Sequence, residues 1–143
     1  MNTPRYDKVQ VGDALPALEL SPISRTTLAL FAGASGDHNP IHIDTDFARK
    51  AGMPDVFAHG MLGMAWLGRL LTNWAPQSRL RRFDVRFQGI THLANAISCT
   101  GRIVEKREMA PENFDKALAD RWYADKDWHT YYTGEITAAY LDK

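Results

Sequence analysis

The segment GMLGMAWLGRLLTNWA, residues 60–75, decides the fold class of this chain, because it is apolar on nearly all sides of a helix. Such a helix is stable in water only where other protein surrounds it. Pro76 follows the segment and is expected to stop the helix, since proline cannot continue the backbone hydrogen bonds. Arg69 interrupts the apolar run, which is also shorter than the roughly 20 residues that span a bilayer. The sequence therefore predicts a buried core helix.

After this helix the sequence has the period of β-strands. Phe83, Val85 and Phe87 alternate with charged residues, which is typical of a strand with one buried face. Segments rich in β-branched, aromatic and small residues continue toward the C-terminus. Three further strands are expected, at residues 96–106, 116–124 and 128–141, the last two joined as a hairpin by a polar turn at residues 125–127.

Two shorter helices are expected before the core helix. One covers residues 24–35 and the other residues 44–52, and each begins at a capping side chain, Ser24 and Asp44. The loop between them is polar and contains an Asn-Pro pair that prevents a simple helix. Because residues 1–143 contain no repeat or linker, we expect a single α+β domain in which an antiparallel sheet wraps the central helix.

Composition and charge exclude several classes of protein. Apolar residues make up 45% and charged residues 24% of the chain, as in ordinary globular domains. The 17 basic and 17 acidic side chains balance, and no block of like charge indicates a nucleic-acid or membrane partner. Cys99 is the single cysteine, which rules out intrachain disulfides and cysteine-rich zinc sites. Because the N-terminus resembles neither a secretory signal nor a transit peptide, we expect a cytoplasmic protein.

The densest cluster of reactive side chains is SGDHNPIHID, residues 35–44. In one interpretation, Asp37 and Asn39 form local turn hydrogen bonds and the histidines only fill space. In a second, the histidines and aspartates hold a metal, but the paired helical histidines and cysteine ligands of strong zinc motifs are absent, so we expect none. In a third, Asp37 and His42 form an acid–base pair that reaches one water or one substrate proton.

A second motif, AHGML at residues 58–62, lies at the start of the core helix. The first amides of a helix lack intrahelical partners and lie at the positive end of its dipole. The Gly60 N–H can therefore donate to a developing oxyanion, and glycine allows a ligand to approach the backbone closely. The alternative is that Gly60 merely starts the helix and that His59 makes a packing contact.

The succession of these motifs resembles the MaoC-like (R)-specific enoyl-CoA hydratases, a family of hot-dog proteins. The resemblance covers residues 26–75, in which SGDHNPIHID is followed by an alanine-bearing helix and then by AHGML. The strand FDVRFQGI, residues 83–90, agrees more loosely. The resemblance implies a single hot-dog domain over residues 1–143, with an antiparallel sheet wrapped around a long central helix. It also implies a dimer with acyl thioester sites near the subunit interface.

The resemblance implies a role for each candidate residue. Asp37 and His42 would together hold and activate the water and supply the proton. The Gly60 amide would bind the thioester oxygen, on which an enolate-like transition state builds negative charge. Asn39 and His59 complete the candidate substrate-binding set, with Asn39 expected to hold the loop because its amide exchanges no proton usefully at neutral pH. Some relatives carry a serine on the central helix near the site, and its first two turns here contain none.

The expected activity is reversible addition of water to a trans-2-enoyl-CoA, or to an acyl-carrier thioester, which gives the (R)-3-hydroxyacyl thioester. No cofactor is expected, since coenzyme A is part of the substrate. Two alternatives remain open. One is a hot-dog thioesterase, in which water attacks the thioester carbonyl and releases a thiol. The other is a subunit of a heteromeric hydratase or dehydratase, so a homodimer is expected with a heterodimer as the alternative.

Overall fold

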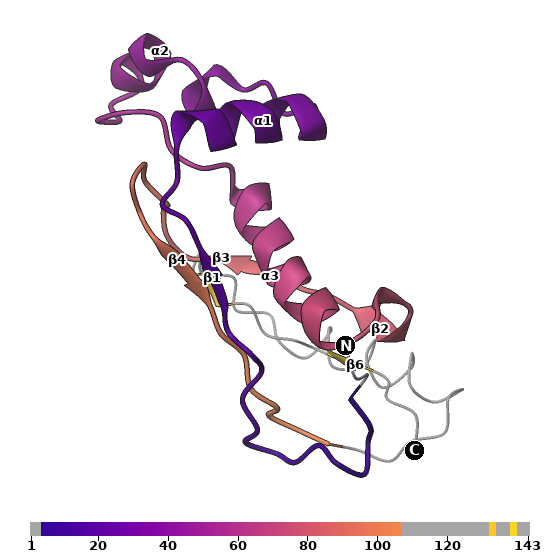
Figure 1. Ribbon diagram of the computed structural model, residues 1–143. Coiled ribbons are helices and arrows are strands. Elements are labelled where there is room, and N and C mark those ends of the chain that lie inside the picture. The colour runs from indigo at the N-terminus through magenta and orange to yellow at the C-terminus, as the bar shows by residue number, and fades with distance from the viewer. Residues whose placement is uncertain (1–3, 107–131, 134–137, 140–143) are drawn as a thin grey trace, which may run out of the picture.

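The computed structural model describes residues 4–106, 132–133 and 138–139 of the chain. Two helices occupy one end of the molecule, and a third runs from that end along a pair of strands (Figure 1). The helices are α1 (Arg25–Ser35), α2 (Thr45–Lys50) and α3 (Gly60–Trp74), with the 3-10 helices η1 (Pro40–His42) and η2 (Gln77–Arg79). The strands are β1 (Leu18–Leu20), β2 (Leu80–Arg82), β3 (Arg86–Phe87), β4 (Ile97–Cys99), β5 (Tyr132–Thr133) and β6 (Ala138–Ala139).

Helix α1 begins where the sequence predicts it. The Ser24 hydroxyl accepts a hydrogen bond from the Thr27 amide at 3.0 Å, which satisfies one of the free amides of the first turn. Leu28 and Ala32 are buried on its inner side. Gly36 ends the helix in the left-handed conformation, with φ 74°, and its N–H donates to the Ala32 carbonyl. Glycine adopts this conformation with little strain, so the chain turns sharply there into the polar loop.

Helix α2 confirms the predicted capping residue. The Asp44 carboxylate accepts hydrogen bonds from the amides of Asp46 and Phe47. The helix ends at Lys50, two residues before the expected boundary at Gly52, where φ reaches 85°. Because a left-handed glycine follows the last turn, the chain leaves the helix and returns toward α3.

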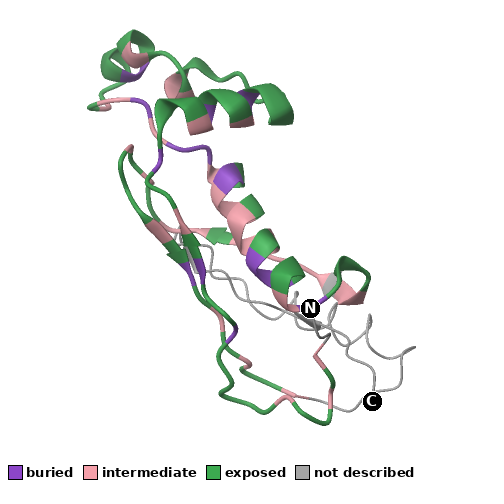
Figure 2. Ribbon diagram, viewed as in Figure 1, coloured by how far each residue is buried: buried purple, intermediate pink, exposed green. Residues whose placement is uncertain are grey.

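Helix α3 lies where the core helix is expected, but it is not buried on all sides. Leu62, Leu70 and Leu71 are buried, whereas Met61 is 53% exposed. The exposed side of the helix is visible in green in Figure 2. The exposed residues recur every three or four positions, and apart from Met61 they are small or polar. The average apolarity of the segment is high, so the sequence hardly reveals this exposed side. These exposed positions are Met61, Ala65, Arg69, Thr72 and Asn73.

Strands β1 and β4 form an antiparallel pair beside α3. Leu18 lies opposite Cys99, and Leu20 lies opposite Ile97. Beyond the strands, an isolated antiparallel bridge joins Ala14 to Arg102. The expected strand at residues 96–106 is therefore present as a three-residue strand followed by an irregular continuation.

The predicted strand at Phe83–Phe87 is interrupted. Strand β2 pairs with β6 and has a register shift between Leu80 and Arg82, whereas β3 pairs with β5. The chain thus changes its strand partner at residues 83–85, and strict alternation of side chains does not reveal such a change. The expected hairpin at residues 116–141 lies outside the described residues, except for β5 and β6.

Within the described residues, the core consists of two clusters that meet on α3. Trp66 and Ile97 pack against both clusters, so the helical end and the strand end share one continuous apolar interior. The first cluster contains Ile23, Leu28, Ala48, Val56, Ala58 and Leu62. The second contains Leu15, Leu18, Leu70, Leu71 and Cys99. Within the described residues, no helix combines the length and the apolarity needed to cross a membrane.

Candidate active site

The loop between α1 and α2 is held by its own side chains. The Asp37 amide donates to the Ser35 hydroxyl at 3.2 Å, and Asp37 Oδ1 in turn accepts from the Asn39 amide at 3.2 Å. Asn39 Oδ1 accepts from the Ile41 amide, also at 3.2 Å, and caps η1. These are the local turn bonds that one interpretation of the sequence expects. They leave Oδ2 of the exposed Asp37 carboxylate without a hydrogen bond to any described residue, so the turn and the acid–base interpretations are compatible.

His42 is oriented by a backbone carbonyl. Its Nδ1 atom lies 2.8 Å from the carbonyl oxygen of Phe57, and because a carbonyl only accepts, Nδ1 carries the hydrogen. In the neutral ring Nε2 then has the free lone pair that a general base needs. The backbone of Phe57 forms an isolated antiparallel β-bridge with His92. The Phe57 ring packs against the His42 ring, with 4.9 Å between their centroids.

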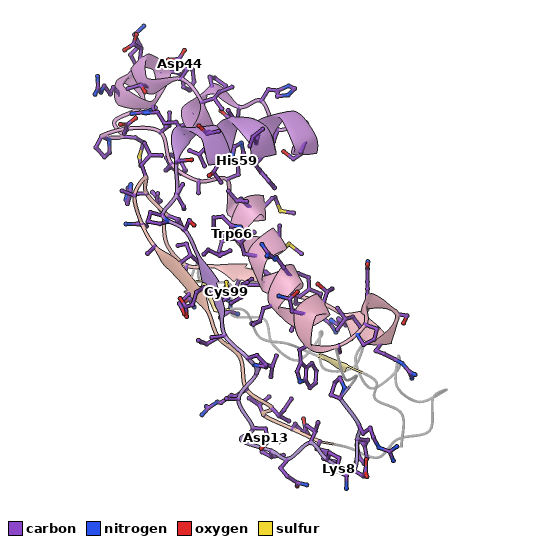
Figure 3. The ribbon with its side chains drawn as sticks, in the orientation of Figure 1. Lys8, Asp13, Asp44, His59, Trp66 and Cys99 are labelled. Atoms are coloured by element: carbon purple, nitrogen blue, oxygen red, sulfur yellow. The ribbon has the colours of Figure 1, made fainter. Side chains whose placement is uncertain are left out.

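His59 is buried beneath the loop, with 1% of its surface exposed. Its Nε2 donates to the backbone carbonyl of Asp37 at 3.2 Å, and its ring centroid lies 4.0 Å from that of His42. Burial, and then the neighbouring His42, lower the pKa of His59, against the hydrogen bond and charge of Asp37. Figure 3 shows His59 at the junction of α1 with the start of α3. The sequence places His59 among the substrate-binding candidates, and in the structure its side chain lies in the interior beneath the loop.

Asp37, His42 and His59 form one cluster. A side-chain nitrogen or oxygen of each lies within 4.8 Å of the others. Two ring centroids only 4.0 Å apart, with 31° between the planes, place the imidazoles face to face. One nitrogen of each ring is already bonded to a backbone carbonyl, His42 Nδ1 to that of Phe57 and His59 Nε2 to that of Asp37, so each ring has one nitrogen left.

Gly60 is the first residue of α3, and no side chain caps this helix end. The Leu62 amide donates to the His59 carbonyl at 3.1 Å, whereas the Gly60 amide has no partner among the described residues and lies at the positive end of the helix dipole. Because Gly60 directly follows His59 in the chain, this helix end adjoins the Asp37–His42 cluster. The two sequence motifs thus meet in space, as the acid–base interpretation requires, with a donor suited to an oxyanion beside a carboxylate and an imidazole.

The links between the two motifs are what sequence reasoning misses. Neither the His42–Phe57 bond nor the His59–Asp37 bond has a signal in local periodicity, because the partners are 15 and 22 residues apart. Asp44 caps α2, and His38 is exposed, so neither joins the cluster within the described part of the chain.

Antiparallel strands thus lie beside α3, and the cluster of Asp37, His42 and His59 adjoins the N-terminus of this helix. The family model described as "MaoC like domain" matches residues 8–120. The chain belongs to this family.

Three relatives illustrate the similarity. Over 83 residues the chain is 35% identical to the fatty acid synthase subunit beta of Saccharomyces cerevisiae, covering 56% of this chain and 4% of the relative. Over 100 residues it is 28% identical to the mitochondrial 3-hydroxyacyl-[acyl-carrier-protein] dehydratase of Arabidopsis thaliana, covering 70% of this chain and 59% of the relative. An (R)-hydratase structure from Pseudomonas aeruginosa is 27% identical, with a TM-score of 0.63, covering 76% of this chain and 68% of that one.

Proposed function

We propose that the protein catalyses reversible addition of water to a trans-2-enoyl thioester, which yields an (R)-3-hydroxyacyl thioester. The single observation that carries this proposal is the meeting of the Asp37 carboxylate and the His42 imidazole in one cluster, beside the uncapped start of α3 at Gly60. A carboxylate, an imidazole and a backbone donor are the groups needed to move protons and to stabilise an enolate. The hydratase and dehydratase relatives support the same class of reaction.

In the hydration direction, one water supplies both the hydroxyl group added at C3 and the hydrogen added at C2. The carboxylate of Asp37 orients the water, and Nε2 of His42 accepts a proton as the water oxygen bonds to C3 of the enoyl group. The electron pair of the 2,3 double bond then moves toward the thioester, whose oxygen accepts a hydrogen bond from the Gly60 amide. A proton returns to C2 from the Asp37–His42 pair, so the thioester bond stays intact. Dehydration uses the same steps in reverse.

The acyl carrier is coenzyme A or an acyl carrier protein. The name of the Arabidopsis relative specifies the carrier protein, and the chain spans only a small fraction of the fungal synthase subunits. No separate cofactor or metal is required, because acid–base chemistry at Asp37 and His42 suffices. Activity that survives a strong chelator would support this part of the proposal.

We further infer that the complete domain wraps its sheet around α3 and works as a dimer in the cytoplasm. Met61 at the start of α3, 53% exposed, and Leu30 on α1, 70% exposed, are apolar side chains that a second subunit can cover. A homodimer and a heterodimer differ in native mass and in whether another chain co-purifies.

The test follows the loss of enoyl-thioester absorbance with trans-2-enoyl-CoA esters of increasing length, with a thiol-trapping dye in parallel. Loss of absorbance without thiol release, and its abolition in Asp37→Asn, is the expected result. Asp46→Asn is the matched control, because Asp46 is exposed on α2 and outside the cluster. Thiol release would instead indicate a thioesterase, and full activity of Asp37→Asn would reject the assigned site.

A further inference from the structure

His59 contacts both members of the acid–base pair from beneath. Its Nε2–H holds the main-chain carbonyl of Asp37 at 3.2 Å, and its ring lies against that of His42. The ring of Phe31, on α1, packs edge-on against the ring of His59, with 5.1 Å between the two ring centroids. A single side chain thus joins α1, the Asp37–His42 loop and the start of α3.

The hydrogen bonds of His59 define its tautomer. Because the Asp37 carbonyl can only accept, the ring hydrogen lies on Nε2. The remaining nitrogen, Nδ1, is buried and has no hydrogen-bond partner among the described residues. A charged ring would leave a second N–H unpaired in the interior, at a considerable cost in free energy. His59 is therefore a neutral ring with one directed donor.

The position of His59 in the chain adds a third connection. It is the residue immediately before Gly60, at the N-cap of α3, and its side chain makes no capping bond to the helix. The side chain instead reaches back to the loop of α1. Any shift of His59 is therefore transmitted both to the oxyanion donor and to the acid–base pair.

We propose that His59 is a positioning residue, which holds the Asp37 carbonyl and the face of the His42 ring so that both catalytic groups and the Gly60 amide keep one mutual geometry. This inference rests on the proposed hydratase function. It replaces the sequence-based expectation that His59 binds substrate. Because catalytic groups displaced by about 1 Å lose roughly 100-fold in rate, such a residue acts on kcat more than on KM.

Two substitutions separate the donor from the ring. His59→Phe keeps an apolar ring against His42 and removes the donor. His59→Gln places an amide N–H at nearly the same distance from the backbone as Nε2, and so restores the bond to the Asp37 carbonyl. We expect His59→Phe to lower kcat about 10–100-fold with KM changed less than about threefold. The kcat of His59→Gln is expected to be at least tenfold higher than that of His59→Phe.

A second measurement does not depend on activity. The Asn39 amide bonds to the Asp37 side chain, so its hydrogen exchange reports how firmly the loop is held. Exchange is expected to be about fivefold faster in His59→Phe than in the parent, as loss of one neutral hydrogen bond implies, and to return toward the parent rate in His59→Gln. If the parent hydrates no enoyl thioester, the proposed function fails while the exchange result still decides the role of His59.

Three outcomes would overturn the proposal. The first is an unchanged kcat together with unchanged loop exchange in His59→Phe. The second is a rise in KM at constant kcat, which would show that His59 binds substrate directly. The third is a His59→Gln variant no better than His59→Phe in either measurement. Thermal unfolding of each variant shows whether a loss of rate comes from a folded protein. If His59→Phe does not fold, the comparison of His59→Gln with His59→Ala decides the question.

Discussion

The Nδ1 atom of His42 donates to the carbonyl oxygen of Phe57, and the 2.8 Å bond joins the loop after α1 to the segment that leads into α3. The bond determines which nitrogen carries the hydrogen and therefore which nitrogen keeps a lone pair that can accept a proton. It also separates two properties of His42 that a simple truncation would remove together, namely its structural bond and its basicity.

Asparagine at position 42 should preserve the bond and remove the base. Its amide nitrogen corresponds in reach to Nδ1 of histidine, so His42→Asn can still donate to Phe57 but cannot accept a proton. We expect the melting temperature to stay near that of the parent and kcat/KM to fall about 10²–10⁴-fold. His38→Asn is the matched control, since His38 is exposed in the same loop. Retention of more than about a tenth of the activity in His42→Asn would remove His42 from proton transfer.

The local parts of the fold could be predicted from sequence because their causes are local. Ser24 and Asp44 cap helices through bonds to residues two or three positions ahead, and Asn39 holds its own loop. The Asp37–His42 pair is likewise contained in one short motif. The contact of His59 with the Asp37 carbonyl depends on how α3 packs beneath α1, and the break at residues 83–85 depends on which strands are partners. No periodicity contains that information.

The buried His59 should make folding sensitive to mild acid. Its pKa in the folded protein lies below the ordinary value of 6.5, so the unfolded chain binds the proton first. Stability is therefore complete above about pH 6.5 and declines as the pH falls below it. Urea unfolding at pH 7.5 and 5.5 should show a larger loss on acidification for the parent than for His59→Gln. Equal losses in the two proteins would mean that His59 does not contribute to this dependence.

Arg25, Thr45 and Asp55 connect the first turns of α1 and α2 to the loop before α3. The Arg25 guanidinium lies 2.6 Å from Asp55 Oδ2 and 2.9 Å from the Thr45 hydroxyl. The hydrogen bond from Arg25, followed by that from the Val56 amide, lowers the pKa of Asp55 below 3.8. Its stabilising effect is thus present above about pH 3.8 and is lost as the pH falls through the lower, folded-state pKa.

Asp55→Asn should therefore lower the melting temperature at pH 7, and the difference from the parent should shrink as the pH is lowered toward 3. Asp7→Asn is a suitable comparison, because Asp7 pairs with Arg5 only two residues away on the surface and joins no separate elements. Its effect is expected to be smaller. Equal melting temperatures for Asp55→Asn and the parent at pH 7 would show that the connection adds nothing to stability.

Two glycines of the first helical region should respond in opposite directions to the same substitution. Gly36 adopts φ 74°, so Gly36→Ala is expected to cost about 1 kcal/mol even though a Cβ meets no atom within 4 Å. Gly33 lies inside α1, also with open space around a Cβ, and Gly33→Ala is expected to stabilise the protein by up to about 1 kcal/mol. Urea unfolding measures both. Because Gly36 immediately precedes Asp37, Gly36→Ala should also reduce activity, whereas Gly33→Ala should leave it unchanged; the same sign of stability change in both would contradict the left-handed turn at Gly36.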